Sequence, residues 1–168
     1  MSTLLAVGNP ESSGETIAIF DTASWTLQSG PNLTRTVRGL DFSNDDSLLL
    51  ATHDVTPFVR ISSTADWSDQ GAPAAEGAGK ACGFSPDSIE AGLSVSFLSA
   101  VNRLDRGDGW NILPQYTGGN PAGNGTDAKY SPDGNYHAVA STVTPRVTVY
   151  NRASGAKESF PAQDATHR

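Results

Sequence analysis

Short stretches of alternating apolar and polar residues recur along the chain and predict β-strands. The clearest examples are residues 58–61 and 146–150, in which every second side chain is apolar. A period of two places alternate side chains on opposite faces of a strand, so each stretch predicts a strand with one buried face. No stretch keeps the 3.6-residue period of an amphipathic helix for more than two turns. The pattern therefore predicts an all-β chain.

The predicted strands belong to a unit of about 42 residues that occurs four times. Its anchor is a pentad with an aromatic residue, Ser and Asp at positions 1, 2 and 4, found at residues 42–46, 84–88 and 130–134. The second and fourth units align without a gap, which places Thr56-Pro57 on Thr144-Pro145. One domain is expected, with units at about residues 1–33, 34–76, 77–122 and 123–168.

Each unit contains the same succession of four predicted strands. A first strand leads into the pentad, whose Asp favours a tight turn by hydrogen bonding to its own backbone. A second and a third strand follow, and a weaker outer strand begins at Trp25, Trp67 or Trp110. Four meandering strands in a unit of this length are typical of a β-propeller blade. We therefore predict a β-propeller built from four four-stranded antiparallel blades.

The two ends of the chain are expected to share one blade. The chain begins at what the other units define as their second strand. Aligning residues 151–154 with 21–24 places residues 165–168 on 35–38, within a first strand. The C-terminal strand is thus predicted to complete the first blade and to remove an exposed strand edge.

Two closures fit this expectation. One chain could form a four-bladed ring, or two chains could exchange the terminal strand in an eight-bladed ring. We favour the first, because a short tail closes most readily on its own chain.

Composition and charge narrow the possible partners. Hydrophobic residues make up 37% of the chain and charged residues 17%, with 17 glycines and 10 prolines, which fits short strands joined by turns and is too apolar for disorder. The net charge of −7 repels phosphate backbones, so no nucleic-acid partner is expected. No apolar stretch approaches a membrane span, and the start of the chain lacks a signal peptide pattern. No membrane partner is expected either.

The single cysteine and the three histidines suggest no reaction centre. Cys82 lies in a predicted strand and is expected to be a small buried apolar residue. His53, His137 and His167 occupy non-equivalent positions, so they do not form a ligand set. We expect them to be polar surface residues or hydrogen-bonded strand residues.

The carboxylates and tryptophans that recur in register are expected to serve the fold. Asp45, Asp46, Asp87 and Asp133 lie in the repeated turns. Residues 105–109 resemble a calcium loop but lack its alternating ligands and distal Glu. The three tryptophans are interpreted as packing between blades, with an aromatic binding row as the alternative. The sequence therefore predicts no catalytic residue, no cofactor-binding residue, no cofactor and no metal ligand.

Two of the units carry a family resemblance. Residues 42–53 with 57–61, and 130–141 with 145–152, resemble the WD40-like repeats of tailed-bacteriophage proteins. The resemblance covers nearly the whole chain and is weaker in the first and third units. The Trp-Asp and Gly-His signatures of eukaryotic WD40 proteins are missing. Bacterial propeller lactonases share the Ser-Pro-Asp-Gly turn, but their channel ligands are not matched here.

The resemblance implies a non-enzymatic structural protein of a bacteriophage virion, as a capsid decoration subunit or a tail or fibre component. Its expected partners are other virion proteins and a host surface receptor, with a homo-oligomer as a further expectation. It would be made in the host cytoplasm and located in the virion. The alternative is a propeller enzyme or small-molecule-binding protein that uses the channel mouth near the Asp-bearing turns. A cytoplasmic scaffold that binds host proteins is a third reading.

Overall fold

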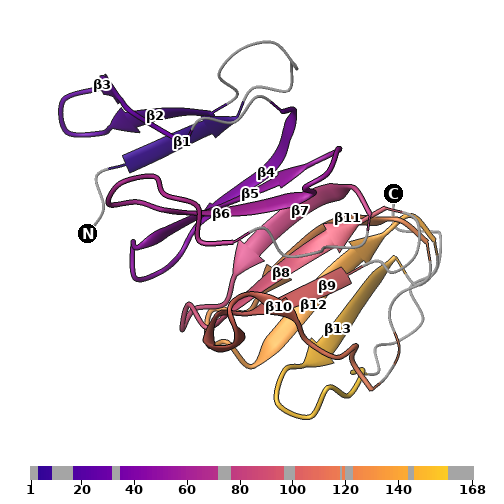
Figure 1. The fold of residues 1–168 in the computed structure, drawn as a ribbon. Helices are drawn as coiled ribbons and strands as arrows, with labels where there is room; N and C mark the ends of the chain where they lie inside the picture. Colours follow the sequence, from indigo (N-terminus) through magenta and orange to yellow (C-terminus); the bar gives the residue numbers. More distant parts are fainter. Residues whose placement is uncertain are drawn as a thin grey trace.

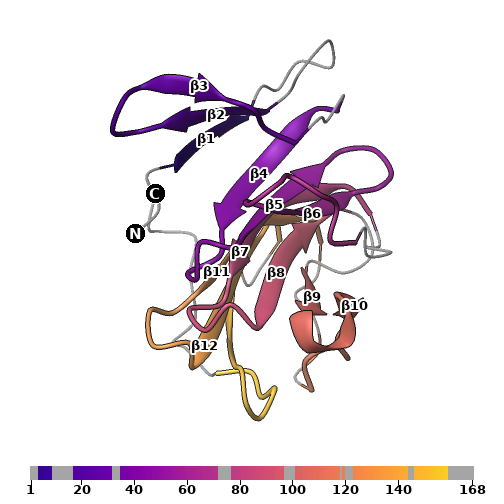
Figure 2. The same cartoon turned by 60° about the vertical axis from the view of Figure 1, so that its left-hand side comes forward.

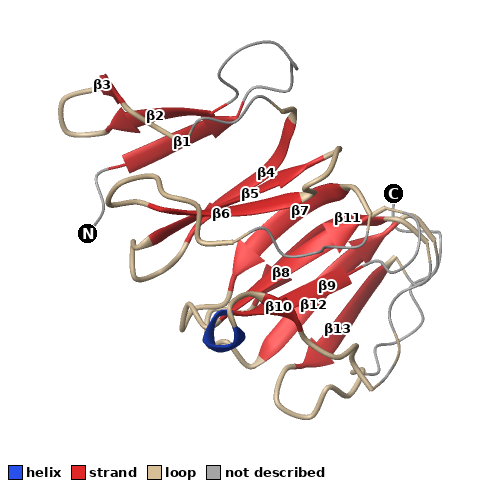
Figure 3. Cartoon of the chain, in the orientation of Figure 1, coloured by secondary structure: helices blue, strands red, loops and turns tan. Residues whose placement is uncertain are grey.

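The computed structural model describes residues 4–8, 17–31, 35–71, 77–96, 101–117, 119, 123–143 and 146–158. These residues form β-strands joined by turns, with a single 3-10 turn (Arg106–Asp108) between β9 and β10 (Figure 3). The prediction of an all-β chain is confirmed. The strands are β1 (Leu4–Gly8), β2 (Ile17–Asp21), β3 (Thr26–Gln28), β4 (Val37–Phe42), β5 (Leu48–His53), β6 (Val59–Ser63), β7 (Gly79–Phe84), β8 (Glu90–Val95), β9 (Val101–Asp105), β10 (Asn111–Ile112), β11 (Gly125–Tyr130), β12 (Tyr136–Ser141) and β13 (Val147–Asn151).

The strands form four antiparallel sheets, each a meander within one of the predicted units. The first sheet is β1-β2-β3, the second β4-β5-β6, the third β7-β8-β9-β10 and the fourth β11-β12-β13. Four strands are present in the third sheet. In the second and fourth sheets the described residues reduce the outer strand to single bridges, at Asp69 and Lys157. The first sheet, as far as it is described, contains counterparts of the second, third and outer strands.

The sheets stack face to face in the order of the chain. The inner strands β4, β7 and β11 contact one another in turn, and β1 contacts β4. In both views the first and fourth sheets lie at opposite ends of the stack, with the other two between them (Figures 1 and 2). The arrangement is propeller-like, and the described residues form an open arc. The predicted closing strand, residues 165–168, lies outside the described residues.

The core fills the spaces between successive sheets. β5 is buried along its whole length, because alternate side chains face the two neighbouring sheets. Leu49 and Ala51 pack with Ile17 and Ile19 of the first sheet. The hydrophobic cluster between the second and third sheets consists of Leu48, Leu50, Val59, Ile61, Cys82, Phe84, Ala91, Leu93, Val95, Leu104 and Trp110. The two internal sheets are thus covered on both faces.

The repeated pentad forms one hydrogen-bonded turn in three places. Its Ser hydroxyl donates to the Asp carboxylate two residues later, at 2.6 Å between Ser43 Oγ and Asp45 Oδ1. The same hydroxyl oxygen accepts the backbone N–H of Leu48 at 3.0 Å. The equivalent bonds join Ser85 to Asp87 and Glu90, and Ser131 to Asp133 and Tyr136. The prediction that these aspartates serve the turn is confirmed.

The three tryptophans differ in burial. Trp110 is buried and meets Phe84 edge to face, with ring centroids 5.9 Å apart. Trp67 is half-buried and packs on the cluster between the first and second sheets. Each of these two therefore packs in the space shared with the preceding sheet. Trp25 is 69% exposed. Within one chain the packing interpretation is wrong for Trp25, because no described sheet precedes its own.

Candidate functional site

The repeat is broken by charge on one face of the third sheet. The face of the second sheet that meets the next sheet is aliphatic. At the aligned positions the third sheet carries Glu90, Gly92 and Arg103, and these face the fourth sheet. Their counterparts in the second sheet are Leu48, Leu50 and Ile61. The junction of the third and fourth sheets is therefore the part of the fold where polar chemistry replaces ordinary packing, and it is the candidate site.

Glu90 lies between two arginines in this junction. Its carboxylate is 2.9 Å from Arg152 Nε and 3.5 Å from Arg103 Nη1. All three side chains are only 12–15% exposed. Arg152 also reaches Asp87 at 2.7 Å. Charges with so little access to water require paired partners, and here each charge has one.

The ion pair of Arg152 with Asp87 shifts the pKa values of both residues in the direction that keeps them charged. Burial by itself lowers the pKa of Arg152, but hydrogen bonds to Asp87 and Glu90 raise it above its ordinary value. Burial also opposes ionisation of Asp87. The Arg152 guanidinium and the Ser85 hydroxyl outweigh that effect and lower the pKa of Asp87 to about 2. These groups stay ionised at neutral pH and hold the two sheets together.

Aromatic rings fill the rest of the junction. Tyr130 stacks on His137 with ring centroids 4.3 Å apart, and Tyr116 stacks on Tyr150 at 4.2 Å. The Tyr116 hydroxyl and His137 Nδ1 share a hydrogen bond of 2.9 Å. The Arg103 guanidinium lies 4.0 Å from the centre of the Tyr116 ring, a cation–π contact. Stacked aromatic rings therefore extend from the arginine side chains of the ion pairs into the fourth sheet.

His137 is fully buried in β12 and hydrogen-bonded to Tyr116, so the expectation of a hydrogen-bonded strand residue is confirmed for it. Burial and the positive charges of Arg103 and Arg152 lower its pKa to about 3, which keeps the ring neutral at pH 7. Its Nε2 atom faces Gly92, where an added Cβ would lie only 2.5 Å away. The ring is enclosed on that side, so it cannot exchange protons with a bound substrate there. His137 serves as a packed hydrogen-bonding residue.

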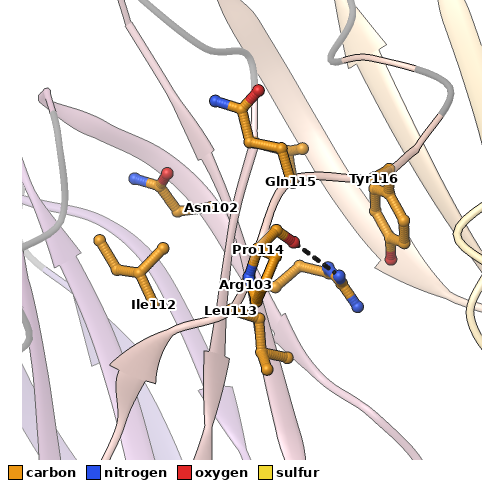
Figure 4. A pocket seen from close by; sticks show the side chains of 8 residues that line it. Asn102, Arg103, Ile112, Leu113, Pro114, Gln115 and Tyr116 are labelled. Atoms are coloured by element: carbon orange, nitrogen blue, oxygen red, sulfur yellow. Dashed lines mark hydrogen bonds between the residues drawn. The ribbon is translucent and has the colours of Figure 1, made fainter.

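A small hollow of about 120 Å³ lies beside this junction, over β9 and β10. Arg103 crosses it and donates to the Pro114 carbonyl at 2.8 Å, while the Tyr116 ring stands next to the guanidinium (Figure 4). Ligand pockets usually measure about 300–1,000 Å³. This hollow is too small for a substrate of ordinary size.

The loop of residues 105–109 joins the second and third sheets. Asp105 accepts the Gly107 N–H at 2.8 Å and caps the short 3-10 turn. Arg106 then reaches Asp45 at 2.6 Å and the Ser47 hydroxyl at 3.0 Å. This contact repeats the one between Arg152 and Asp87 one junction further along. In this loop Asp105 caps the turn and Arg106 forms an ion pair with the second sheet, so both residues have structural roles.

The other sequence-selected residues lie apart from this junction. His53 is buried, with Nδ1 3.3 Å from the Thr36 carbonyl oxygen, and burial lowers its pKa. Cys82 is buried as predicted, and burial raises the pKa of its thiol to about 12. Asp46 lies in its turn, and His167 falls outside the described residues. No group of three or more His, Cys, Asp or Glu side chains in the described residues could hold a metal ion.

The sequence alone assigns no role to the junction residues Glu90, Arg103 and Arg152, although the repeat contains a signal for two of them. Glu90 and Arg103 stand where the repeat places aliphatic residues, and a charge at a core position demands a partner. The resemblance to the phage repeats is also weaker in the third unit, but the pairing of its charges with Arg152 of the fourth unit is visible only in the structure.

No protein-family model matches the chain, and no curated protein matches it. The fold itself is common, since 850 chains of solved structures match. One is hydrazine synthase of Kuenenia stuttgartiensis, with a TM-score of 0.80 and 15% sequence identity. The match covers 95% of this chain and 46% of that one, so the chain spans about half the length of this neighbour. At such low identity the likeness shows the fold alone. No helix in the described part of the chain is long and apolar enough to cross a membrane.

Proposed function

We propose that this chain is a non-enzymatic structural protein of a bacteriophage virion, either a capsid decoration subunit or a tail or fibre component. It acts through contacts with other virion proteins and, at an outer position, with a host surface receptor. The resemblance of its second and fourth units to phage WD40-like repeats supports a bacteriophage origin. The junction between the third and fourth sheets supports a structural rather than an enzymatic role.

The observation that carries this proposal is the pairing of Glu90 with Arg103 and Arg152. In many enzymes, polar residues that break a structural pattern converge on a cleft. Here they converge on one another across two sheets, beside a hollow of only about 120 Å³. Such a network locks adjacent sheets into one rigid body. A rigid stack of sheets that displays many loops suits a protein that works by its surface.

The composition of purified phage particles tests the proposal. Particles are banded in a density gradient and analysed by mass spectrometry, with the infected-cell lysate as a reference for expression. Peptides of this chain should band with infectious particles in a fixed ratio to the major capsid protein. An early enzyme of the same phage serves as the control that should stay in the lysate. The proposal fails if the chain is abundant in the lysate and missing from the particles.

The alternative places a ligand at the channel mouth near the Asp-bearing turns. There Asp45 and Asp87 are ion-paired with Arg106 and Arg152, which engages the carboxylates that a ligand or metal would need. Metal analysis of the purified protein with a lactone and sugar hydrolysis screen tests this alternative. Turnover that is lost in an Asp87→Asn variant would favour it over the structural role.

A further inference from the structure

Among the described residues, each of the two end sheets of the stack leaves an apolar face uncovered. On the outer face of the first sheet, Leu5 and Val7 are 40% and 46% exposed, and Trp25 and Leu27 are 69% and 64% exposed. The positions of Leu5 and Val7 in the repeat are buried in every later unit, as Leu49 and Ala51, Ala91 and Leu93, and His137 and Val139. A face with this pattern in an internal sheet is covered by the preceding sheet. Contiguous apolar surface of this kind marks an interaction site.

Trp25 indicates that the surface covering this face resembles the preceding sheet of an internal junction. Trp67 and Trp110 occupy the same position in their units, and each packs in the space shared with the preceding sheet. Trp25 has the same left-handed backbone, with φ of 55° against 59° and 67°. The residue therefore occupies the same backbone position as the other two, at an end of the stack where the described chain has no preceding sheet.

The outer face of the fourth sheet has the character of that missing sheet. Tyr136 and Val147 are 40% and 39% exposed, and Ala138 and Val149 are half-buried beside them. These four residues align with the residues of the second sheet that belong to the cluster with Trp110. The aligned residues are Leu48, Val59, Leu50 and Ile61. A hollow of about 490 Å³ lies over this face, and Lys129 and Glu158 contribute to its lining.

We propose that the outer face of the fourth sheet binds the outer face of the first sheet of a second copy of this chain. Trp25 of one copy then packs over Tyr136 and Val149 of the other, as Trp110 packs over the second sheet. The junction continues the sheet-on-sheet packing that already joins the four sheets within the chain. Each copy carries both faces, and head-to-tail contacts form a ring when the rotation between copies closes; the proposal is that it closes at two copies, with two identical junctions.

The second copy is the occupant that the faces themselves specify. The chain's own first sheet lies at the opposite end of the stack (Figures 1 and 2). The two faces are complementary by repeat position, since one aligns with the face that meets the preceding sheet and the other with the face that meets the next sheet. The contact is therefore head to tail. This inference goes beyond the virion role and holds or fails independently of it.

The proposed junction differs in one respect from the two internal junctions that involve the third sheet. At these two junctions Arg106 and Arg152 reach back to an Asp in the preceding turn. The aligned position in the first unit is Thr22, which would meet the turn of Asp133. The junction is thus held by apolar contact without an arginine ion pair. Salt screens ion pairs but not apolar burial, so association should persist at high ionic strength.

Light scattering on the full chain after size exclusion tests the inference. The chain has a mass of 17.5 kDa, and the proposal expects a species of twice that mass at both low and high salt. A Trp25→Asp variant blocks one face and a Val147→Asp variant blocks the other. Each alone should elute as a monomer, with a dissociation constant raised at least about tenfold. Val55→Asp, at a 50% exposed valine outside both faces, should leave the pair intact.

Mixing the two blocked variants distinguishes head-to-tail contact from misfolding. The mixture holds one intact first-sheet face and one intact fourth-sheet face on different copies, so a mixed pair with one sound junction should form. Circular dichroism of each variant should match that of the unmodified chain.

Three outcomes would overturn the inference. These are a monomer at every concentration, an assembly of more than two copies, or a pair that survives both substitutions. A lack of rescue on mixing folded variants would equally refute the head-to-tail arrangement.

Discussion

One position in the repeat imposes an unusual backbone on large side chains. Trp25, Trp67, Trp110 and Gly155 all lie in the left-handed region, with φ between 55° and 69°. Only the glycine adopts this conformation without a steric cost, which is about 1–2 kcal/mol for other residues. Burial offsets that cost at Trp110, whereas Trp25 is mostly exposed within one chain. Tryptophan at this position therefore stabilises the third unit, where burial offsets the backbone strain, but not the first unit, where the ring is exposed.

We expect glycine substitution at this position to separate the two effects. In a Val147→Asp background, which blocks the proposed junction, Trp25→Gly should change the free energy of unfolding by less than about 1 kcal/mol, because relief of backbone strain balances the added chain entropy. Trp110→Gly should lower it by about 3 kcal/mol or more, since a buried ring is lost. Urea unfolding measures both. Equal losses would show that the position, not the packing, determines stability.

The third sheet differs from its neighbours as an element. Its face toward the fourth sheet replaces aliphatic residues with Glu90, Gly92 and Arg103 and meets an aromatic stack. The glycine is required here because His137 occupies the space of its side chain. The Glu90 ion pairs, the glycine at position 92 and the buried His137 ring depend on one another across the two sheets. We therefore expect single substitutions in this junction to be destabilising.

Loss of the central carboxylate should destabilise the junction strongly. Glu90→Gln leaves Arg103 and part of Arg152 without a counter-charge at low exposure, and breaking such a pair costs about 3–5 kcal/mol. Asp54→Asn is the matched control, because its ion pair with Arg38 is 29–42% exposed and such pairs contribute about 1 kcal/mol or less. Chemical denaturation of both variants gives the comparison. Similar losses would mean that burial of the Glu90 pair has no special weight.

At the scale of the molecule, the repeat made the fold predictable and limited what could be predicted of the junctions. Alternation and the pentad Ser and Asp indicated the strands and turns, because both are local effects. Whether an outer strand forms a ladder or only a bridge, as at Asp69 and Lys157, depends on contacts outside the unit. The Glu90–Arg152 pair joins residues 62 apart in sequence. Periodicity within a unit carries no information about such a pair.

Buried neutral histidines couple the stability of the whole molecule to pH. The folded-state pKa of His137 is about 3 against an ordinary 6.5, and that of His53 is also lowered. Between pH 6.5 and about pH 3, His137 takes up a proton in the unfolded chain but not in the folded one. The free energy of unfolding therefore has its full value above pH 6.5 and falls as the pH is lowered. The slope is about 1.4 kcal/mol per pH unit for each fully buried histidine.

We therefore expect the free energy of unfolding to fall between about pH 6.5 and pH 5, before carboxylates with ordinary pKa values take up protons. Asp87 contributes nothing to this window, because its pKa of about 2 confines its effect to pH values below the ordinary 3.8. A His137→Phe variant should lose its share of the slope while the His53 share remains. Urea unfolding across this range measures both proteins, and an unchanged slope in the variant would show that His137 takes up a proton without unfolding.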